Sequence, residues 1–282
     1  MRQEKRVVRT GRDDKLRGSQ ALPRSETFAF AGWELFHFAT LDSTNREAHR
    51  RAACGLAEKT VILADCQTAG QGRHARTWES ASGKGLWVSL LVPVSVPFSC
   101  LPQSTLVLAV AVREAIAAAT GIDLQIKWPN DLLARGRKCC GLLVESAAMP
   151  SPPEGSALSL ILGIGINLTQ TEEDFPPFLR EKAASLFWVS GREHGREQIL
   201  REVLRHVEQW FGLWAAQGFA PARAAWLAHN CTVGRRLILP DGYGYTCGFA
   251  ADLAPDGALV ARADDGVLLP IASGEIRFSD GK

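Results

Sequence analysis

The sequence lacks the long apolar runs that would place it in a membrane or send it through one. A membrane-spanning helix needs about 20 mainly apolar residues. The best candidate, residues 106–120, is interrupted by Arg113 and Glu114, and no apolar run follows Met1. We therefore expect no secretory signal peptide, no membrane partner and a cytoplasmic location.

The spacing of the cysteines fits neither a metal site nor a disulfide framework. Of the seven cysteines only Cys139 and Cys140 are adjacent, which is typical of a reducing compartment. The formal net charge of the 282 residues is +2, so the charge balance requires no nucleic-acid partner. The P-loop and Rossmann glycine signatures are also missing.

The beginning of the chain differs from the rest in composition. Residues 1–27 are basic, poor in aromatic residues and without helical or alternating apolar patterns. We expect a disordered arm there, too short for a helix-turn-helix domain.

Strand-like and helix-like patterns follow in residues 28–230, which we expect to form one catalytic domain. Apolar patterns predict strands at 33–38, 61–64, 86–92, 124–128, 132–134, 138–145 and 156–168. They predict helices at 103–120, 198–217 and 221–229, and a shorter one that ends at residue 53 after an N-cap cluster at 42–45.

Residues 231–282 change in texture to short strand-like runs separated by Asp-Gly pairs. These pairs are residues 241–242, 256–257 and 265–266. Asp-Gly is a hairpin signal, so we expect a small five-stranded barrel joined to the preceding α/β domain.

The most informative segment reads Gly-Gln-Gly-Arg-His-Ala-Arg-Thr-Trp over residues 70–78. It lies in a long loop without apolar periodicity, and such loops are usually functional or disordered. Its glycines would let the backbone approach a ligand, and Arg73 and Arg76 carry guanidinium groups that suit phosphate oxygens. An ordinary surface loop could have the same composition, so this segment alone does not decide.

Three further segments place polar residues or glycines within apolar strands. The first is Lys-Trp-Pro-Asn-Asp at 127–131, where a lysine in an apolar strand is costly unless an anion meets it. The others are 138–145, whose alternation predicts Lys138 and Cys140 on one face, and Gly-Ile-Gly-Ile-Asn-Leu at 163–168. Each is equally compatible with plain sheet packing.

In this order and spacing, the segments together resemble the biotin protein ligase family. The matching patterns are Asp-Ser-Thr-Asn at 42–45, Gln-x-x-Gly-x-Gly-Arg-x-x-Arg-x-Trp at 67–78, and the segments at 127–131, 138–145 and 163–168. The resemblance covers residues 35–168 firmly and the C-terminal region loosely. It implies the family form without an N-terminal DNA-binding domain.

The resemblance also implies a fold and a reaction. The fold would be a mixed sheet flanked by helices, similar to class II aminoacyl-tRNA synthetases, with an SH3-like C-terminal domain. The reaction would convert biotin and ATP to biotinyl-5′-AMP with Mg²⁺. It would then transfer biotin to a lysine of a biotin carboxyl carrier domain of a carboxylase. We expect no DNA partner, and a homodimer is an open alternative.

Two anionic substrates in one pocket require cations, which assigns candidate roles. Lys127 would stabilise the α-phosphate and carboxylate oxygens, and Arg73 and Arg76 would hold the triphosphate and then the adenylate. By resemblance, biotin would contact Ser43, Thr44, Asn45, Gln67, Gln71, Gly72, Arg73, Lys138 and Gly141. ATP or the adenylate would contact Arg73, Arg76, Trp78, Lys127, Asn130 and Asn167, with Asp131 as a candidate Mg²⁺ ligand.

One departure and two alternatives remain at this point. Gln71 occupies a position where the family commonly has arginine, which puts the hold on the adenylate in doubt. A lipoate- or octanoate-transferring enzyme of similar fold would also modify a carrier lysine, although Gln67 and the complete 127–131 segment favour biotin. A biotin-sensing repressor would carry a winged helix before the same catalytic domain.

Overall fold

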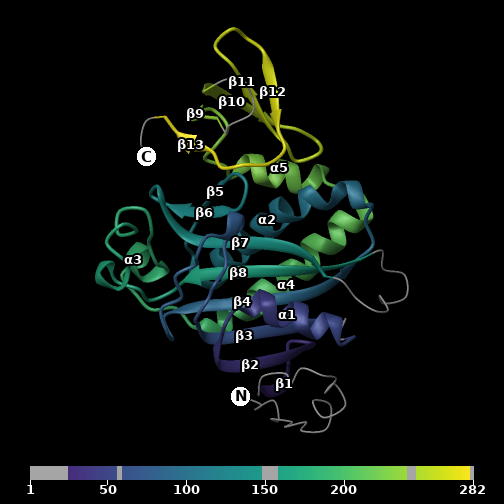
Figure 1. Ribbon diagram of the computed structural model, residues 1–282, viewed down its shortest axis with the longest axis vertical. Coiled ribbons are helices and arrows are strands. Elements are labelled where there is room, and N and C mark those ends of the chain that lie inside the picture. Colours follow the sequence, from purple (N-terminus) through teal and green to yellow (C-terminus); the bar gives the residue numbers. More distant parts are fainter. Residues whose placement is uncertain (1–24, 56–58, 148–157, 240–245, 280–282) are drawn as a thin grey trace.

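The computed structural model describes residues 25–55, 59–147, 158–239 and 246–279. Within these residues the larger sheet has eight strands in the order β1-β2-β3-β4-β8-β7-β6-β5 (Figure 1). They are β1 (Glu26–Phe30), β2 (Trp33–Leu41), β3 (Thr60–Gln67), β4 (Gly85–Val94), β5 (Gln125–Lys127), β6 (Asp131–Ala134), β7 (Arg137–Ala147) and β8 (Leu158–Asn167). Strands β2 and β3 pair parallel and the other neighbours antiparallel. The predicted mixed sheet is confirmed.

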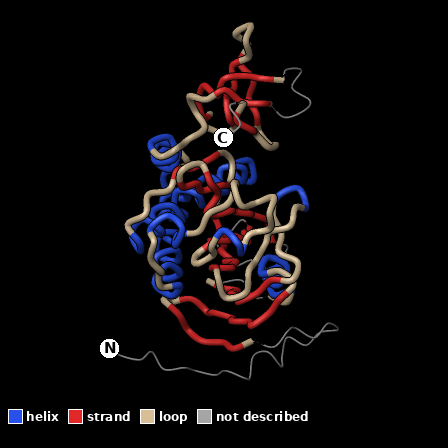
Figure 2. The backbone as a smooth tube through the Cα atoms, turned by 90° about the vertical axis from the view of Figure 1, so that its left-hand side faces the viewer, coloured by secondary structure: helices blue, strands red, loops and turns tan. Residues whose placement is uncertain are grey.

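The alternation of side chains along the strands builds one apolar layer on each face of this sheet. On β2, Leu35 belongs to one core cluster and Phe36 to the other, as a period of two requires. Helix α1 (Thr44–Ala53) packs on the Phe36 face, and helices α2 (Ser104–Thr120) and α4 (Arg196–Gln217) cover the opposite face. Helices accordingly lie on both sides of the strands in Figure 2.

Helix α2 shows why apolar composition alone is a weak signal for a membrane. Together with the short 3₁₀ segment before it, it spans Phe98–Thr120 and is long and apolar enough to cross a bilayer. However, 67% of its most apolar window is buried inside the protein, and it packs against α4. The helix ends at Gly121, which adopts a φ of +75° as the predicted C-terminal stop requires.

The smaller sheet has five antiparallel strands in the order β12-β11-β10-β9-β13. They are β9 (Arg236–Ile238), β10 (Cys247–Leu253), β11 (Leu259–Arg262), β12 (Leu268–Ile271) and β13 (Arg277–Phe278). Two of the predicted Asp-Gly turns connect β10 to β11 and β11 to β12, whereas the pair at 241–242 lies outside the described residues. All five strands lie within 231–282, for which a separate domain stays a prediction.

Several contacts join the two sheets. The Trp128 indole donates to the Gly257 carbonyl at 3.3 Å, and Gln103 donates to the Pro255 carbonyl at 3.2 Å. Arg223, on helix α5 (Ala220–Ala228), pairs with Asp252 of β10 at 2.8 Å. The smaller sheet therefore packs against the end of the larger one at β5 (Figures 1 and 2).

The structure corrects three expectations about local structure. Strand β1 begins at Glu26, inside the segment expected to be an arm, and pairs with β2; residues 1–24 lie outside the described residues. Helix α3 (Leu186–Ser190) was not expected. A register shift between β6 and β7 places both Cys139 and Cys140 in the core at 0% exposure. Lys138 therefore does not share a face with Cys140, because the bulge interrupts the alternation.

Candidate functional site

One pocket gathers the motifs that are scattered along the sequence. It lies where the loop after β3, the segment 127–131, strands β7 and β8, and the segment before β13 meet. The cavity has a volume of about 180 Å³ and opens to solvent at its mouth. We call it the central pocket.

Every predicted site residue lines the central pocket except Asn167. Asn167 is 3% exposed, donates to the Ala184 carbonyl at 3.0 Å and accepts from Gln170 at 3.1 Å. The prediction of a nucleotide contact at Asn167 therefore finds no support in this arrangement, because its amide is used in holding the chain after β8.

Three glycines of the predicted motifs make room for side chains that lie flat on β7 and β8. A Cβ atom on Gly165 would lie 2.7 Å from an atom of the Trp78 indole, and one on Gly141 would lie 2.6 Å from the same ring. A Cβ on Gly163 would overlap the Asn45 amide. Such short distances require glycine. Glycine is required at these three positions because side chains that line the pocket lie against them, and plain sheet packing would not require it.

One part of the pocket wall is neutral; we call Thr44, Asn45 and Gln67, which line the pocket, together with Ser89 behind them, the neutral cluster. Gln67 Oε1 accepts from the Thr44 backbone N–H at 2.8 Å and lies 3.1 Å from Thr44 Oγ1, and Gln67 Nε2 donates to Ser80 at 3.0 Å. Ser89 Oγ lies 2.7 Å from Thr44 Oγ1 and 2.5 Å from Asn45 Oδ1. Thr44, Asn45 and Ser89 are at most 4% exposed.

The predicted N-cap cluster holds the neutral cluster at the start of α1. Ser43 is the N-cap residue and has an extended backbone, but its side chain makes no capping hydrogen bond. Asp42 accepts from the Ser43 N–H and pairs with Arg50 at 2.8 Å. The hydrogen bond from Arg50 lowers the pKa of Asp42 to about 2. The ion pair thereby ties the loop before α1 to the helix.

The other part of the pocket is charged; we call Arg73, Arg76, Lys127, Lys138, Asp131 and Glu275 the charged cluster. Arg73 Nη1 lies 3.4 Å from Asn130 Oδ1. Burial lowers the pKa of Arg73, and the charge of Asp131 opposes that shift. Lys138 pairs with Asp131 at 2.6 Å, and its ammonium lies 5.1 Å from the Trp78 ring centroid.

Lys127 is half-buried and faces the pocket, close to the smaller sheet. Its ammonium lies 4.9 Å from the centroid of the Phe278 ring, which the Arg235 guanidinium also approaches, at 3.6 Å. A cation over an aromatic face is attracted by the ring quadrupole. The lysine thus lies beside the glycine-containing loop, which our interpretation of the sequence required.

Sequence reasoning missed the contribution of the smaller sheet. Glu275 and Ile276 line the pocket, and Glu275 forms a bidentate ion pair with Arg76. That pairing raises the pKa of Arg76 and lowers the pKa of Glu275. No sequence signal pointed to Glu275, since its partner lies 199 residues earlier. Trp188 packs against the core and lies outside the pocket lining.

The loop between β3 and β4 also contains unusual backbone conformations. His74 and Ala75 have φ values of 55° and 56°, which are uncommon for residues other than glycine. Such outliers cluster at ligand-binding sites and switch regions. Both lie between Arg73 and Arg76 in the sequence.

Comparison with known proteins places this arrangement in a family. The model of the biotin/lipoate A/B protein ligase family matches residues 38–167. The bifunctional ligase/repressor BirA of Bacillus spizizenii is 36% identical over 236 residues, which are 84% of this chain and 71% of that protein. The biotin–[acetyl-CoA-carboxylase] ligase of Paracoccus denitrificans is 34% identical over 81% of this chain and 94% of that protein.

The chain belongs to the biotin protein ligase family. Its fold agrees with the biotin protein ligase from Aquifex aeolicus in complex with biotin and ATP, with a TM-score of 0.74 and 28% identity. The match covers 87% of this chain and 99% of that one. The predicted family, fold class and enzyme class are therefore confirmed, and the protein is a biotin ligase.

Proposed function

We propose that the protein joins biotin to ATP as biotinyl-5′-AMP and then transfers the biotinyl group to a lysine of a biotin carboxyl carrier domain. The observation that carries this proposal is one pocket that holds both the neutral cluster and the charged cluster. Biotin has a neutral cyclic urea at one end and a carboxylate at the other. The first matches Thr44 and Gln67, and the second matches Lys127 and Arg73.

In the first step, an oxygen of the biotin carboxylate attacks the α-phosphorus of ATP. A new P–O bond forms, the bond to the bridging oxygen breaks, and pyrophosphate leaves with the electron pair. Lys127 and Arg73 would stabilise the negative charge that gathers on the α-phosphate oxygens. Preorganised donors at such a position are worth about 10²–10³ in rate.

In the second step, the neutral amine of the carrier lysine attacks the activated carbonyl carbon. The C–N bond forms, the bond from carbon to the phosphate oxygen breaks, AMP leaves with the electron pair, and the amine proton passes to solvent. Until then, the loop that carries Arg73 and Arg76 would cover the mixed anhydride. Exclusion of water is what protects such an intermediate from hydrolysis.

Magnesium would be held mostly by the substrate. In the described parts of the chain, no group of three or more His, Cys, Asp or Glu side chains could hold a metal ion. Mg²⁺ is usually bound by one or two carboxylates together with substrate phosphates, and Asp131 in the pocket lining fits that pattern. When bound, the ion would neutralise phosphate charge beside Lys127.

The decisive test is mass spectrometry of a biotin carboxyl carrier domain after incubation with the protein, ATP, Mg²⁺ and biotin. We expect one biotinyl adduct on one lysine, and none when ATP or biotin is omitted. Pyrophosphate release with ATP and biotin alone would isolate the first step. An unmodified carrier together with no pyrophosphate would contradict the proposal.

Two alternatives have their own tests. Titration calorimetry with biotin and with lipoate separates biotin transfer from lipoate transfer, and we expect heat only with biotin. The relatives named ligase/repressor leave DNA binding open as a second activity. Biotin-dependent binding of the full chain to operator DNA would establish it. A cytoplasmic location remains our prediction from the sequence, which fractionation of cells can check.

A further inference from the structure

Behind the pocket wall, four side-chain oxygens form a continuous chain. The order is Gln67 Oε1, Thr44 Oγ1, Ser89 Oγ and Asn45 Oδ1, with successive separations of 3.1, 2.7 and 2.5 Å. Thr44, Asn45 and Gln67 line the central pocket, whereas Ser89 lies on β4 beneath them with 0% exposure. A buried chain of this kind stabilises only those ligands that complete its hydrogen bonds.

Contacts outside the chain fix the amide orientation at each end. Gln67 Oε1 accepts from the Thr44 backbone N–H at 2.8 Å, so this oxygen must face Thr44. Asn45 Nδ2 faces Glu145 Oε2 at 2.7 Å and the Leu143 carbonyl at 3.5 Å, and both of these groups only accept. Asn45 Oδ1 must therefore face Ser89. Both ends of the chain are acceptors.

The chain is short of one proton. Its three contacts join four oxygens, but only the hydroxyls of Ser89 and Thr44 carry protons. Ser89 has a single proton and Asn45 Oδ1 can only accept, so Ser89 donates to Asn45 across the 2.5 Å contact. The 2.7 Å contact between Ser89 and Thr44 then requires the Thr44 proton, in preference to the longer Thr44–Gln67 contact of 3.1 Å. The remaining 3.1 Å contact, between Thr44 Oγ1 and Gln67 Oε1, is then left without a proton. Both oxygens belong to pocket-lining residues.

We propose that Glu145 and Ser89 are positioning residues, which orient the neutral cluster so that Thr44 and Gln67 present two acceptors to a ligand N–H donor. This inference rests on the proposed function, in which that donor is an N–H group of the biotin urea ring. Neither Glu145 nor Ser89 lines the pocket. They act through Asn45 and Thr44.

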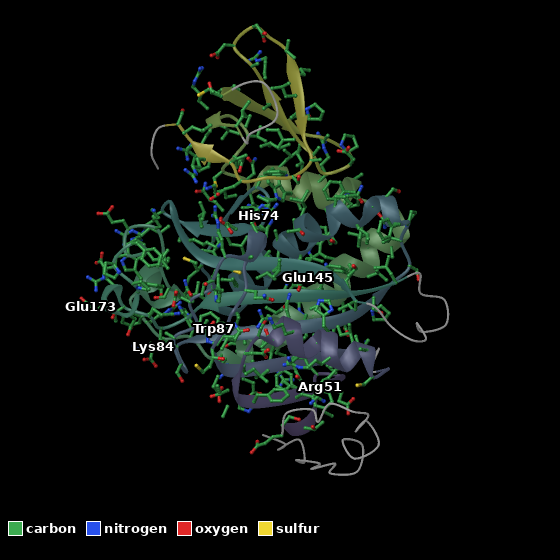
Figure 3. The ribbon with its side chains drawn as sticks, viewed as in Figure 1. Arg51, His74, Lys84, Trp87, Glu145 and Glu173 are labelled. Atoms are coloured by element: carbon green, nitrogen blue, oxygen red, sulfur yellow. The ribbon has the colours of Figure 1, made fainter. Side chains whose placement is uncertain are left out.

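Glu145 is placed to do this from outside the pocket. It projects from β7 on the face that α1 covers (Figure 3), where it contacts Asn45 and lies 3.5 Å from the His49 imidazole. A hydrogen bond from His49 lowers the pKa of Glu145, and the bond from Asn45 does so too, against the effect of burial. The carboxylate is therefore ionised at neutral pH and can only accept.

The proposal predicts that reversing the polarity at position 145 matters more than removing its charge. In Glu145→Gln the side-chain carbonyl still accepts from Asn45, so we expect the Kd for biotin to change less than about threefold. In Glu145→Lys the ammonium can only donate, which turns Asn45 Oδ1 away from Ser89. Ser89 then donates to Thr44, and Thr44 donates to Gln67, so the acceptors are no longer available to a ligand N–H. We expect biotin to bind about tenfold more weakly.

Ser89→Ala tests the same chain from its centre. The Thr44 proton then turns to Gln67 and occupies one of the two acceptors, so we expect the Kd for biotin to rise about tenfold. The KM for ATP should stay within about twofold in all three variants, because the charged cluster is untouched. A general disturbance of the fold would change both parameters together.

Titration calorimetry of the full chain measures the Kd for biotin, and thermal unfolding confirms that each variant is folded. Glu193→Lys is the matched control, since it makes the same charge change at an exposed position. If Ser89→Ala unfolds, the Kd of Glu145→Lys for biotin tests the inference on its own. That variant should remain folded because residue 145 is partly exposed. If Glu145→Lys bound biotin with wild-type affinity, or if Glu193→Lys lost as much biotin affinity, the positioning inference would be overturned and the proposed function would stand. Failure of the wild type to bind biotin would overturn the proposed function as well.

Discussion

The two parts of the central pocket are built in different ways. The neutral cluster lies on the larger sheet and is held by hydrogen bonds between its own members. The charged cluster joins the loop after β3 to the smaller sheet through ion pairs, and its Arg76–Glu275 pair has side chains 59% and 41% exposed. Buried polar networks tolerate little change, whereas exposed ion pairs contribute little on their own.

This difference suggests a division of labour. The neutral cluster can select a ligand by the positions of its hydrogen-bond donors and acceptors, because the side chains of the cluster are oriented before the ligand binds. The charged cluster must bind a triphosphate, then an adenylate, and finally admit a carrier lysine. Ion pairs that can open and exchange partners suit such a sequence, since each anion can replace a carboxylate partner. Five changes separate the two parts experimentally.

The largest effect should come from Lys127 in the charged cluster. For Lys127→Met we expect pyrophosphate release to slow about 10³-fold, because the developing charge on the α-phosphate loses its nearest ammonium. The Kd for biotin should stay within about fivefold. Stopped-flow pyrophosphate detection and calorimetry give the two values, with the exposed Lys182→Met as the matched control. A large loss of biotin affinity with a normal rate would reverse our assignment of the two clusters.

Arg73 should govern retention of the intermediate. In Arg73→Gly the loop loses a charged donor to the adenylate, and charge-assisted hydrogen bonds contribute about 1.5–3 kcal/mol. We expect biotinyl-5′-AMP to dissociate about ten- to a hundredfold faster and to label lysines of unrelated proteins. Mass spectrometry of a bystander protein measures this. Continued selectivity for one carrier would exclude a clamp role for Arg73.

The site residues that were predicted from the sequence belong to motifs, and those that were missed do not. The glycines at 141, 163 and 165 could be recognised in the sequence, because glycine is unusual within an apolar strand. Glu275 was not predicted, since an acidic residue just before a short strand has no feature that indicates a partner far away along the chain.

Local irregularities limited the prediction of the fold. Alternation correctly located the long strands β4, β7 and β8, where apolar residues repeat over many positions. It failed at Cys139, because one extra residue at the β6–β7 shift reverses every face assignment beyond it. Asn167 lies outside the pocket lining, and its position at the end of a motif could not indicate that its amide contacts Ala184.

The pocket glycines of β7 and β8 allow a test with a matched control. In Gly165→Ala the new Cβ would lie 2.7 Å from the Trp78 indole, and overpacking of this kind costs about 1–3 kcal/mol. We expect both substrates to bind about tenfold more weakly, because Trp78 lines the pocket that both are expected to share. Gly212→Ala in α4 meets no atom within 4 Å and should leave binding unchanged. Equal affinities in the two variants would show that Trp78 can move freely.

Glu275 should have a smaller effect, of opposite sign. Its carboxylate occupies the guanidinium of Arg76 and adds negative charge beside the expected triphosphate. In Glu275→Gln we expect the KM for ATP to fall about two- to fivefold, with the Kd for biotin unchanged. Steady-state pyrophosphate assays at several ATP concentrations measure it. A rise in KM would mean that Glu275 holds Arg76 in its binding position.

The smallest effect should appear in stability at low pH, through the ion pair that anchors the neutral cluster. Asp42 has a folded-state pKa of about 2, below its ordinary value of 3.8, because Arg50 donates to it. A depressed carboxyl pKa stabilises the fold above the unfolded value, and this stabilisation is lost as pH falls from about 4 to about 2. Since the Asp42 side chain is 35% exposed, solvent screening reduces its contribution to about 1 kcal/mol. Denaturant unfolding across this range should show less pH dependence in Asp42→Asn than in the wild type. An identical pH dependence in the two proteins would assign the acid sensitivity to other carboxyl groups.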